Sequence, residues 1–255
     1  MDLKGRATLI TGGATGIGRA TALRLARAGA ASIAINYRTA KAEAEEAAAE
    51  VRRIGADALC VPADVRHDDQ ARDMVRQVEE SFGRLDVLVN NAGVTQWIPI
   101  TDLQALTDEV WDDIFDVNVK GAFRCTRAAA PALARTQGIV INVASIAGVI
   151  TTPTMSSLAY GTAKAALIYL TRGLAVALAP NVRVNAVAPA FTDTPWMRKH
   201  HGDHFERVSA RAASSYPLGR IATADEVAGA IAGLITGGDF VTGQTLIVDG
   251  GFSLS

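Results

Sequence analysis

The chain has 255 residues, of which 49% are hydrophobic and 20% charged, and its formal net charge is -1 at pH 7. These values are typical of a soluble globular protein with a sizeable core and exclude a disordered or fibrous chain. The near-neutral charge, without any block of like charge, argues against a nucleic-acid partner or an anionic membrane surface, and no apolar run reaches the roughly 20 residues of a membrane span.

The chain starts with "MDLKGRATLITGG", in which a short apolar segment runs directly into glycines. A signal peptide would have a basic start, a longer apolar stretch and a small-residue cleavage site. A cytoplasmic location is therefore expected. The two cysteines, Cys60 and Cys125, have no near partner in the sequence and are expected to be reduced, buried thiols.

Short runs rich in β-forming residues alternate with longer helical patterns along most of the chain. A helical pattern follows the first of these runs and extends to about Ala28, and a second helical pattern, from Lys41 to Ile54, follows the second run. The seven predicted strands are Ala7–Thr11, Ser32–Asn36, Ala58–Val65, Asp86–Gly93, Gly138–Ser145, Val182–Pro189 and Thr245–Gly251. Each is apolar on both faces, as a strand covered by helices on both sides must be. The alternation predicts one α/β domain over residues 1–255, a single-domain Rossmann fold with a seven-stranded, doubly wound parallel sheet and helices on both faces.

A glycine-rich turn follows the first strand. In "TGGATGIGRAT", Gly12, Gly16 and Gly18 have a TGxxxGxG spacing, which differs from the commoner GxGxxG. Such a turn lets the chain bend sharply, approach a pyrophosphate closely and open a helix whose N-terminal amides face that anion. This spacing indicates a dinucleotide coenzyme.

At this point the chain resembles the classical short-chain dehydrogenase/reductase family over essentially its whole length. The further matches are "NNAG" at Asn90 to Gly93, "DV" at Asp64 and Val65, Asn118 in "DVNVKG", Ser145 in "NVASIAG", and Tyr160 and Lys164 in "SSLAYGTAKAAL". All occur in the order of the family and at similar spacing. The resemblance is greatest to the 3-oxoacyl-(acyl-carrier-protein) reductases and implies a nicotinamide-dependent oxidoreductase acting on a carbonyl or a secondary alcohol.

The end of the second predicted strand bears on the choice of coenzyme. An acidic residue there binds the ribose hydroxyls of NAD, whereas the 2′-phosphate of NADP prefers a cation. The segment reads "INYRTAK", with Tyr37 at the position of the acid and Arg38 next to it. A guanidinium matches a phosphate in geometry as well as in charge. No basic residue stands between Gly12 and Gly16, so NADP(H) is favoured and NAD(H) stays possible.

Tyr160 and Lys164 are four residues apart in a predicted helix, which places them on one face. A free tyrosine has a pKa of about 10, and a nearby ammonium lowers that value by stabilising the phenolate. A tyrosine tuned in this way can exchange a proton with the substrate oxygen while hydride moves. Ser145, just after a strand, can hold that oxygen.

The resemblance assigns further roles. Asn118 would bind a water that connects Lys164 to solvent, and Lys164 would also hold the nicotinamide ribose. Asp64 would bind the adenine amino group. The other coenzyme-binding residues that it implies are Gly12, Thr15, Gly16, Ile17, Gly18, Val65, Asn91, Ala92, Gly93 and Tyr160, with Pro189, Thr192 and Thr194 in a segment similar to the PGxxxT region of the family. Ala190 departs from that pattern, because the family usually has glycine there.

The polar stretch from about residue 190 to 216 breaks the alternation and is predicted to be a mobile lid over the substrate. The predicted substrate pocket comprises Gln96, Trp97, Ser145, Met155, Tyr160, Trp196 and Met197. Residues 149–155 are a candidate pocket wall, since the Ser145-to-Tyr160 gap looks two residues longer than in many fatty-acid reductases. His200 and His204 have metal-ligand spacing, but no third ligand is evident and no metal is predicted.

The helix that begins at Tyr160 is apolar around nearly its whole circumference, so a second buried face needs a partner. The family resemblance implies a homotetramer, with a dimer as the fallback. The alternatives are a sugar or polyol dehydrogenase of the same family, and more remotely a non-catalytic coenzyme-binding regulator. A carrier-bound acyl substrate would require a basic entrance, for which Arg124, Arg127, Arg172 and Arg198 are candidates.

Overall fold

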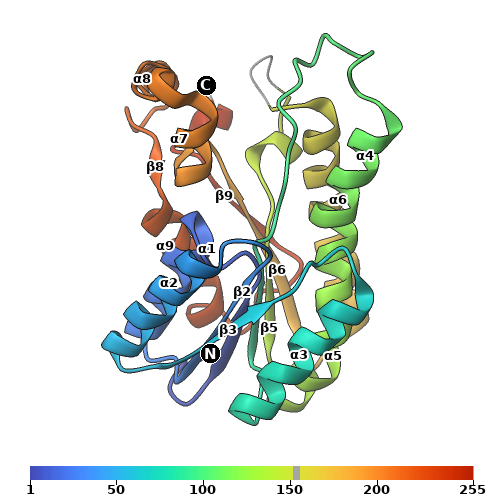
Figure 1. Ribbon diagram of the computed structural model, residues 1–255, viewed down its shortest axis with the longest axis vertical. Coiled ribbons are helices and arrows are strands. Elements are labelled where there is room, and N and C mark those ends of the chain that lie inside the picture. Colours follow the sequence, from blue (N-terminus) through green and yellow to red (C-terminus); the bar gives the residue numbers. More distant parts are fainter. Residues whose placement is uncertain (152–155, 255) are drawn as a thin grey trace.

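A computed structural model describes residues 1–151 and 156–254 of the chain (Figure 1). In these residues one sheet has seven strands in the order β3-β2-β1-β4-β5-β6-β9, and every neighbouring pair is parallel. The strands are β1 (Ala7–Ile10), β2 (Ser32–Tyr37), β3 (Asp57–Pro62), β4 (Val87–Asn90), β5 (Ile139–Val143), β6 (Arg183–Pro189) and β9 (Thr245–Val248). The predicted doubly wound, single-domain fold is confirmed, although most of the strands are shorter than predicted.

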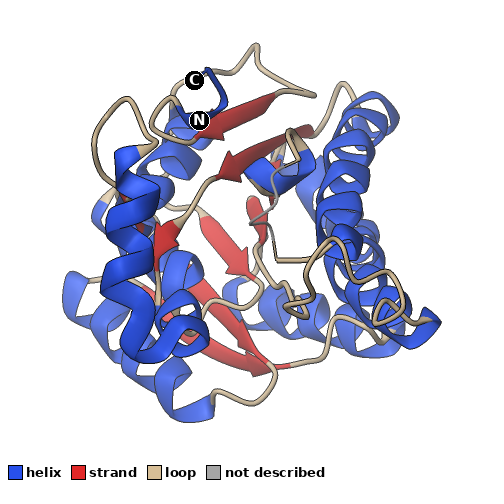
Figure 2. Cartoon of the chain, turned by 90° about the horizontal axis from the view of Figure 1, so that it is seen from above, coloured by secondary structure: helices blue, strands red, loops and turns tan. Residues whose placement is uncertain are grey.

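Helices cover both faces of this sheet (Figures 1 and 2). One face carries α1 (Gly16–Arg27), α2 (Lys41–Ile54) and α9 (Ala224–Thr236). The other carries α3 (Asp68–Phe82), α5 (Ala122–Thr136) and α6 (Leu158–Leu178), and α4 (Asp108–Phe115) leads into α5. Leu9 packs on one side and Ile10 on the other, both fully buried, which explains why β1 has no polar face. At the edge of the sheet, Leu246 and Ile247 of β9 are partly exposed.

The sheet order places a switch point between β1 and β4. From β1 the chain crosses outward to β2 and β3, then returns to form β4 on the other side of β1. Connections therefore leave the carboxyl ends of β1 and β4 in opposite directions and open a crevice between them, where ligands bind in folds of this type. The glycine turn follows β1 and the NNAG segment follows β4, so both predicted coenzyme segments lie at this crevice.

The stretch from about residue 190 to 216 is more regular than predicted. It contains β7 (Thr192–Asp193), α7 (Pro195–His201), a short 3-10 turn η3 (Gly202–His204) and α8 (Phe205–Ser214). β7 pairs with β8 (Ala222–Thr223) in a second, two-stranded sheet. These helices were missed because each is short and amphipathic within a polar segment. That this stretch moves as a lid stays a prediction.

The cysteine prediction needs one correction. Both cysteines are free, and Cys125 is buried in the core, but Cys60 is only half-buried on β3 because that strand forms the edge of the sheet. Among the helices of residues 1–151 and 156–254, none combines the length and the apolar character that crossing a bilayer requires.

Asp86, just before β4, joins the N-terminal strand to the centre of the sheet. Its fully buried carboxylate accepts hydrogen bonds from Arg84 at 2.7 Å, Arg6 at 2.7 Å and the Ala7 amide at 2.9 Å. Burial raises the pKa of Asp86, but these donors outweigh burial and hold the pKa below its ordinary value.

We expect Asp86→Ala to lower the free energy of unfolding by about 3 kcal/mol, because it leaves two arginines and an amide without their acceptor. The folded-state pKa is depressed, so this stabilisation is present above the unfolded-state pKa of about 3.9 and is lost as pH falls through the folded-state value. Urea unfolding at neutral and acidic pH measures both effects. A difference from the wild type that stays constant at pH 3 and pH 7 would contradict the electrostatic account.

Candidate active site

The glycine turn and the NNAG segment are bonded to each other. The Asn91 side-chain amide donates to the carbonyl oxygens of Thr11 at 3.0 Å and Gly12 at 2.9 Å, while Thr11 Oγ1 accepts from the Asn91 and Ala92 amides. Gly12 and Gly16 have φ of 60° and 54°, in the left-handed region that favours glycine. A Cβ on Gly18 would lie 2.4 Å from the Gly12 carbonyl oxygen. The turn therefore needs glycine at these positions.

The start of α1 is open toward the crevice. Thr15 stands at the N-cap without a side-chain hydrogen bond to the helix, and the first turn of α1 has no acidic residue. Gly12, Thr15, Gly16 and Ile17 line a cavity of about 930 Å³. Uncapped helix amides beside a close-approach glycine turn fit a pyrophosphate, so the residues present fit a dinucleotide coenzyme.

Ser145, Tyr160 and Lys164 meet in the same cavity. Ser145 follows β5, and Tyr160 lies in the first turn of α6, where Ser157 caps the helix by accepting from the Tyr160 amide at 3.2 Å. The side chains of Ser145 and Tyr160 are hydrogen-bonded. Lys164 Nζ lies 5.5 Å from the centre of the Tyr160 ring and donates to the Val143 carbonyl oxygen at 2.9 Å. The predicted catalytic group is thus assembled.

The electrostatics of this group differ from the prediction that Lys164 lowers the pKa of Tyr160. Burial raises the pKa of Tyr160 to about 12, with the Ser145 hydrogen bond acting in the opposite direction. Burial also lowers the pKa of Lys164 to about 7. Both shifts favour the uncharged form, because desolvation penalises the phenolate and the ammonium alike. At neutral pH the tyrosine is therefore a protonated donor.

Asn118 lies in η1 (Asp116–Gly121), a π-helical turn between α4 and α5. Such turns widen a helix locally and occur often at functional sites. Its side-chain amide donates to the carbonyl oxygens of Val94 and Ile114, both at 2.8 Å, and its Oδ1 is buried without a partner. A Cβ on Gly93 would lie 2.9 Å from this Oδ1 and 3.6 Å from Lys164 Nζ, so Asn118 and Lys164 both approach Gly93.

The adenosine end of the predicted site has a feature that sequence reasoning missed. The Arg66 guanidinium donates to both oxygens of Asp64, the shortest distance being 2.7 Å, and reaches Asp113 of α4 at 3.0 Å. Arg38 Nη1 is 3.9 Å from the same Asp64 carboxylate. Burial raises the pKa of Asp64, but the Arg66 hydrogen bonds outweigh burial and keep the pKa below its ordinary value. Two arginines thus converge on the residue predicted to bind adenine.

The cavity contains most, but not all, of the predicted residues. Its lining includes the predicted coenzyme residues Gly12, Thr15, Gly16, Ile17, Asn91, Ala92, Gly93, Tyr160, Lys164, Pro189, Thr192 and Thr194, and the pocket residues Trp97, Ser145, Trp196 and Met197. Outside the lining are Gly18, beneath the turn, Tyr37, Arg38, Asp64 and Val65 around β2 and β3, and also Asn118 and Gln96. Met155 and most of the proposed wall at 149–155 lie outside the described residues.

Arg198 ties the lid-like stretch together. It pairs with Asp193 of β7 at 2.6 Å and with Glu206 of α8 at 3.1 Å, and its guanidinium lies 4.2 Å from the centre of the Phe205 ring. Across the cavity, the His200 ring of α7 stacks on Trp97 with centroids 3.6 Å apart and an interplanar angle of 11°. The sequence offered only the "HHGDHF" run as a signal for these ring contacts.

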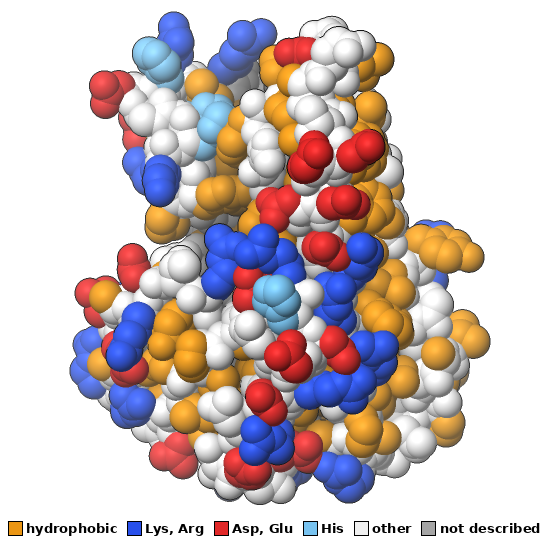
Figure 3. Space-filling model, turned by 45° about the vertical axis from the view of Figure 1, so that its right-hand side comes forward, with side chains coloured by type: hydrophobic (Ala, Val, Ile, Leu, Met, Phe, Trp, Pro, Cys, Tyr) orange, Lys and Arg blue, Asp and Glu red, His pale blue; other side chains and the backbone are white. Residues whose placement is uncertain are grey.

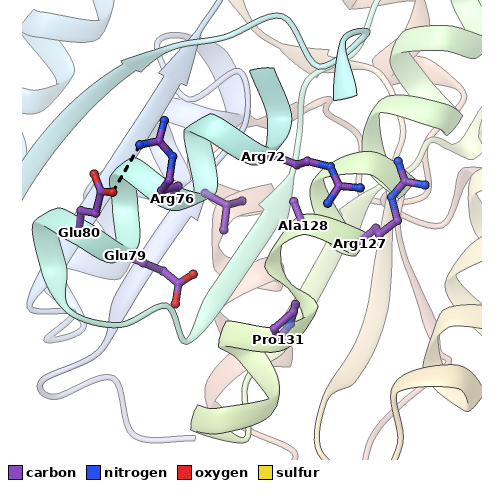
Figure 4. Close-up of a pocket in the computed structure, with 8 residues that line it drawn as sticks. Arg72, Arg76, Glu79, Glu80, Arg127, Ala128 and Pro131 are labelled. Carbon is purple, nitrogen blue, oxygen red and sulfur yellow. Dashed lines mark hydrogen bonds and ion pairs between the residues drawn. The ribbon is translucent and has the colours of Figure 1, made fainter. Parts of the chain in front are cut away.

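A second cavity, of about 480 Å³, lies between α3 and α5 (Figure 4). Charged groups of its lining are already paired, since Arg76 donates to Glu80 at 3.4 Å and Arg127 donates to Asp68, just outside the lining, at 2.6 Å. None of the predicted catalytic, coenzyme-binding or substrate-pocket residues lines it. The crevice at the switch point is therefore the candidate active site.

A dinucleotide crevice with a serine, tyrosine and lysine at its centre defines a nicotinamide-dependent oxidoreductase. A family model described as enoyl-(acyl carrier protein) reductase matches residues 12–253. Granaticin polyketide synthase putative ketoacyl reductase 2 of Streptomyces violaceoruber is 42% identical over 247 residues, 96% of this chain and 95% of that protein. The 3-oxoacyl-(acyl-carrier-protein) reductase FabG of Staphylococcus aureus is 35% identical over 96% of this chain and 97% of its own length.

Among solved structures, an NAD-bound xylitol dehydrogenase superposes with a TM-score of 0.89 at 32% identity, covering 98% of this chain and 100% of that one. The chain belongs to the short-chain dehydrogenase/reductase family. It is an oxidoreductase of the 3-oxoacyl reductase type that uses a nicotinamide coenzyme.

Proposed function

We propose that this protein is an NADP(H)-dependent reductase that converts a ketone to a secondary alcohol, on a 3-oxoacyl-like or other small carbonyl substrate. The observation that carries the proposal is that Ser145 and Tyr160 meet beside the buried Lys164, in a cavity that is also lined by the glycine turn. A non-catalytic coenzyme-binding regulator would have no need for this constellation.

The residues of the site have separate roles in the proposed reduction. When bound in this cavity, the coenzyme would supply hydride for the carbonyl carbon. Ser145 binds the carbonyl oxygen, and Tyr160, protonated at neutral pH because burial raises its pKa to about 12, gives that oxygen its proton. Lys164 is held by the Val143 carbonyl oxygen and is positioned to bind ribose hydroxyls. The free Oδ1 of Asn118 can accept a hydrogen bond from a water that returns a proton toward Lys164.

The decisive experiment follows the loss of reduced coenzyme absorbance with a 3-oxoacyl thioester and a panel of small ketones, with NADPH and NADH in parallel. Turnover of a ketone supports the proposed function. Turnover confined to polyols and sugars would instead favour the polyol dehydrogenase alternative, which the likeness to a xylitol dehydrogenase supports.

Arg38 tests the preference for NADP(H). We expect Arg38→Ser to weaken NADPH binding roughly tenfold or more and leave NADH binding nearly unchanged, because a charge-assisted bond to the 2′-phosphate is lost. Coenzyme fluorescence titration measures both affinities. Arg53, exposed on α2 and paired with Glu50 at 3.6 Å, offers a matched control, Arg53→Ser. Equal weakening of both coenzymes by Arg38→Ser would contradict the assignment.

The charges on the surface favour a small free substrate over a carrier-bound one. Arg124, Arg127 and Arg198, three of the arginines considered for a basic entrance, pair with Asp116, Asp68 and Asp193. Acidic side chains gather over α4 and the turn that follows it (Figure 3). A phosphopantetheine arm carries a phosphate, which such a surface would not attract.

We further propose that the protein acts as a homotetramer, or failing that a dimer. Val176 of α6 is 81% exposed and Phe240, before β9, is fully exposed, which leaves apolar side chains of two separate elements in solvent. Contacts between copies through α6 and through β9 would cover both. Sedimentation velocity distinguishes these states, and a monomer at micromolar concentration would refute both.

A further inference from the structure

Six of the aromatic side chains that line the cavity form one connected series between Tyr160 and the lid-like stretch. They are Trp97, Tyr160, Phe191, Trp196, His200 and His201. Their rings touch in sequence: Tyr160 to Trp196 at 6.4 Å between centroids, Trp196 to Trp97 at 6.0 Å, Trp97 to His200 at 3.6 Å, His200 to His201 at 4.5 Å and His201 to Phe191 at 5.7 Å. The wall that starts at the proton donor is therefore continuous and aromatic.

This wall joins separate parts of the fold. Trp97 comes from the loop after β4, Phe191 from the segment after β6, and Trp196, His200 and His201 from α7. The near-parallel stack of Trp97 and His200, with an interplanar angle of 11°, brings the loop and α7 together across the cavity. Aromatic rings pack most favourably against other flat, polarisable rings, in offset-stacked or edge-to-face arrangements.

His201 adds a polar group to the wall. Its Nε2 is buried without a hydrogen-bond partner, while its ring is fixed by stacking on Phe191 at an interplanar angle of 28°. A buried ring nitrogen without a partner is costly, and native proteins rarely keep one without a reason. His201 itself lines the cavity, so its ring lies beside the space that a substrate would occupy. A neutral imidazole either donates to or accepts from an oxygen, depending on its tautomer.

We propose that the substrate is a ketone built on a planar ring system that carries a second oxygen, with the ring held by the aromatic wall and the second oxygen bound by His201 Nε2. This inference rests on the proposed ketone reductase function and narrows it. A linear 3-oxoacyl thioester offers Nε2 its thioester oxygen but no flat face to the rings. A polyol offers oxygens but no face, so most of the wall would lose its contact.

The first test compares ligands on the wild-type protein. The compounds assayed, each with NADPH and with NADH, are α-tetralone, the set of isomeric monohydroxy-α-tetralones and a linear acetoacetyl thioester. We expect at least one hydroxylated isomer to exceed α-tetralone in kcat/KM by about tenfold, the gain expected when a buried unpaired group finds its partner. Both α-tetralone and this hydroxylated isomer should have a higher kcat/KM than the thioester. A thioester preferred over every ring ketone would overturn the inference and leave the proposed function standing.

The second test removes the nitrogen and keeps the ring. His201→Phe should bring the ratio of kcat/KM for the hydroxylated isomer to kcat/KM for α-tetralone down from about tenfold to about one. His204→Phe is the matched control, since His204 is exposed and does not line the cavity. An unchanged ratio between the two ketones in His201→Phe would refute the role of His201.

Binding is measured independently of turnover. Two of the three tryptophans, Trp97 and Trp196, belong to the wall, whereas Trp111 packs on Phe115 in α4. In a Trp111→Phe background, tetralones should quench the fluorescence saturably and the thioester should not. Quenching without turnover of any carbonyl compound would refute the proposed function but support the ring-binding site. Turnover without quenching by the tetralones would support the proposed function but refute the ring-binding site.

Discussion

Tyr160→Phe is expected to lower kcat/KM for ketone reduction by a factor of about 10² to 10⁴, the range that a positioned proton donor contributes. The variant keeps the ring that packs on Trp196 and loses only the hydroxyl bonded to Ser145. Coenzyme affinity should fall far less than kcat/KM, because the glycine turn and Arg38 do not depend on that hydroxyl. Steady-state kinetics and coenzyme titration on one preparation measure the two quantities.

Tyr169 provides the matched control on the same helix. Its side chain is 76% exposed, so Tyr169→Phe removes a hydroxyl of the same kind away from the cavity and should leave the kinetics unchanged. If Tyr160→Phe retained more than about a tenth of the wild-type rate, the proton would have to come from another group. Ser145, the only other hydroxyl that the mechanism uses, would then be the first candidate.

The sequence predicted the parts of the site that depend on local spacing. The TGxxxGxG turn follows a strand and opens a helix, so three glycines were sufficient to place the coenzyme end of the cavity. Tyr160 and Lys164 are four apart on one helix, which made their shared face predictable. The alternation of buried strands and helices likewise sufficed for the fold class.

Features that depend on packing were not predictable in this way. The sign of the Tyr160 pKa shift was predicted wrongly, because the sequence shows that a lysine is near but not that both groups are buried. The Arg66 bridge to Asp113 spans 47 residues, and the stack of Trp97 on His200 joins a loop to a distant helix. The periodic pattern of apolar residues in the sequence does not indicate such contacts. These contacts and the burial of Tyr160 and Lys164 therefore had to come from the structure.

Gly18→Ala is expected to abolish measurable coenzyme binding. The added Cβ would lie 2.4 Å from the Gly12 carbonyl oxygen and 2.6 Å from Asn91 Nδ2, and neither is the free end of a flexible side chain. Asn91 would have to give up its bonds to Thr11 and Gly12, which hold the glycine turn against the NNAG segment. We expect coenzyme affinity to fall by more than about a hundredfold and stability by about 1–3 kcal/mol, the usual cost of overpacking.

Gly233→Ala is the control for adding a methyl group to a helical glycine. Gly233 lies in α9 with nothing within 4 Å of the added Cβ, so this variant should gain about 0.5–1 kcal/mol from helix propensity and bind coenzyme normally. Thermal unfolding and coenzyme titration of both variants separate a local effect on the turn from a general effect on the fold. If Gly18→Ala bound coenzyme like the wild type, the close packing of the turn on Asn91 would not be what shapes the pyrophosphate site, and the uncapped amides of α1 alone would have to suffice.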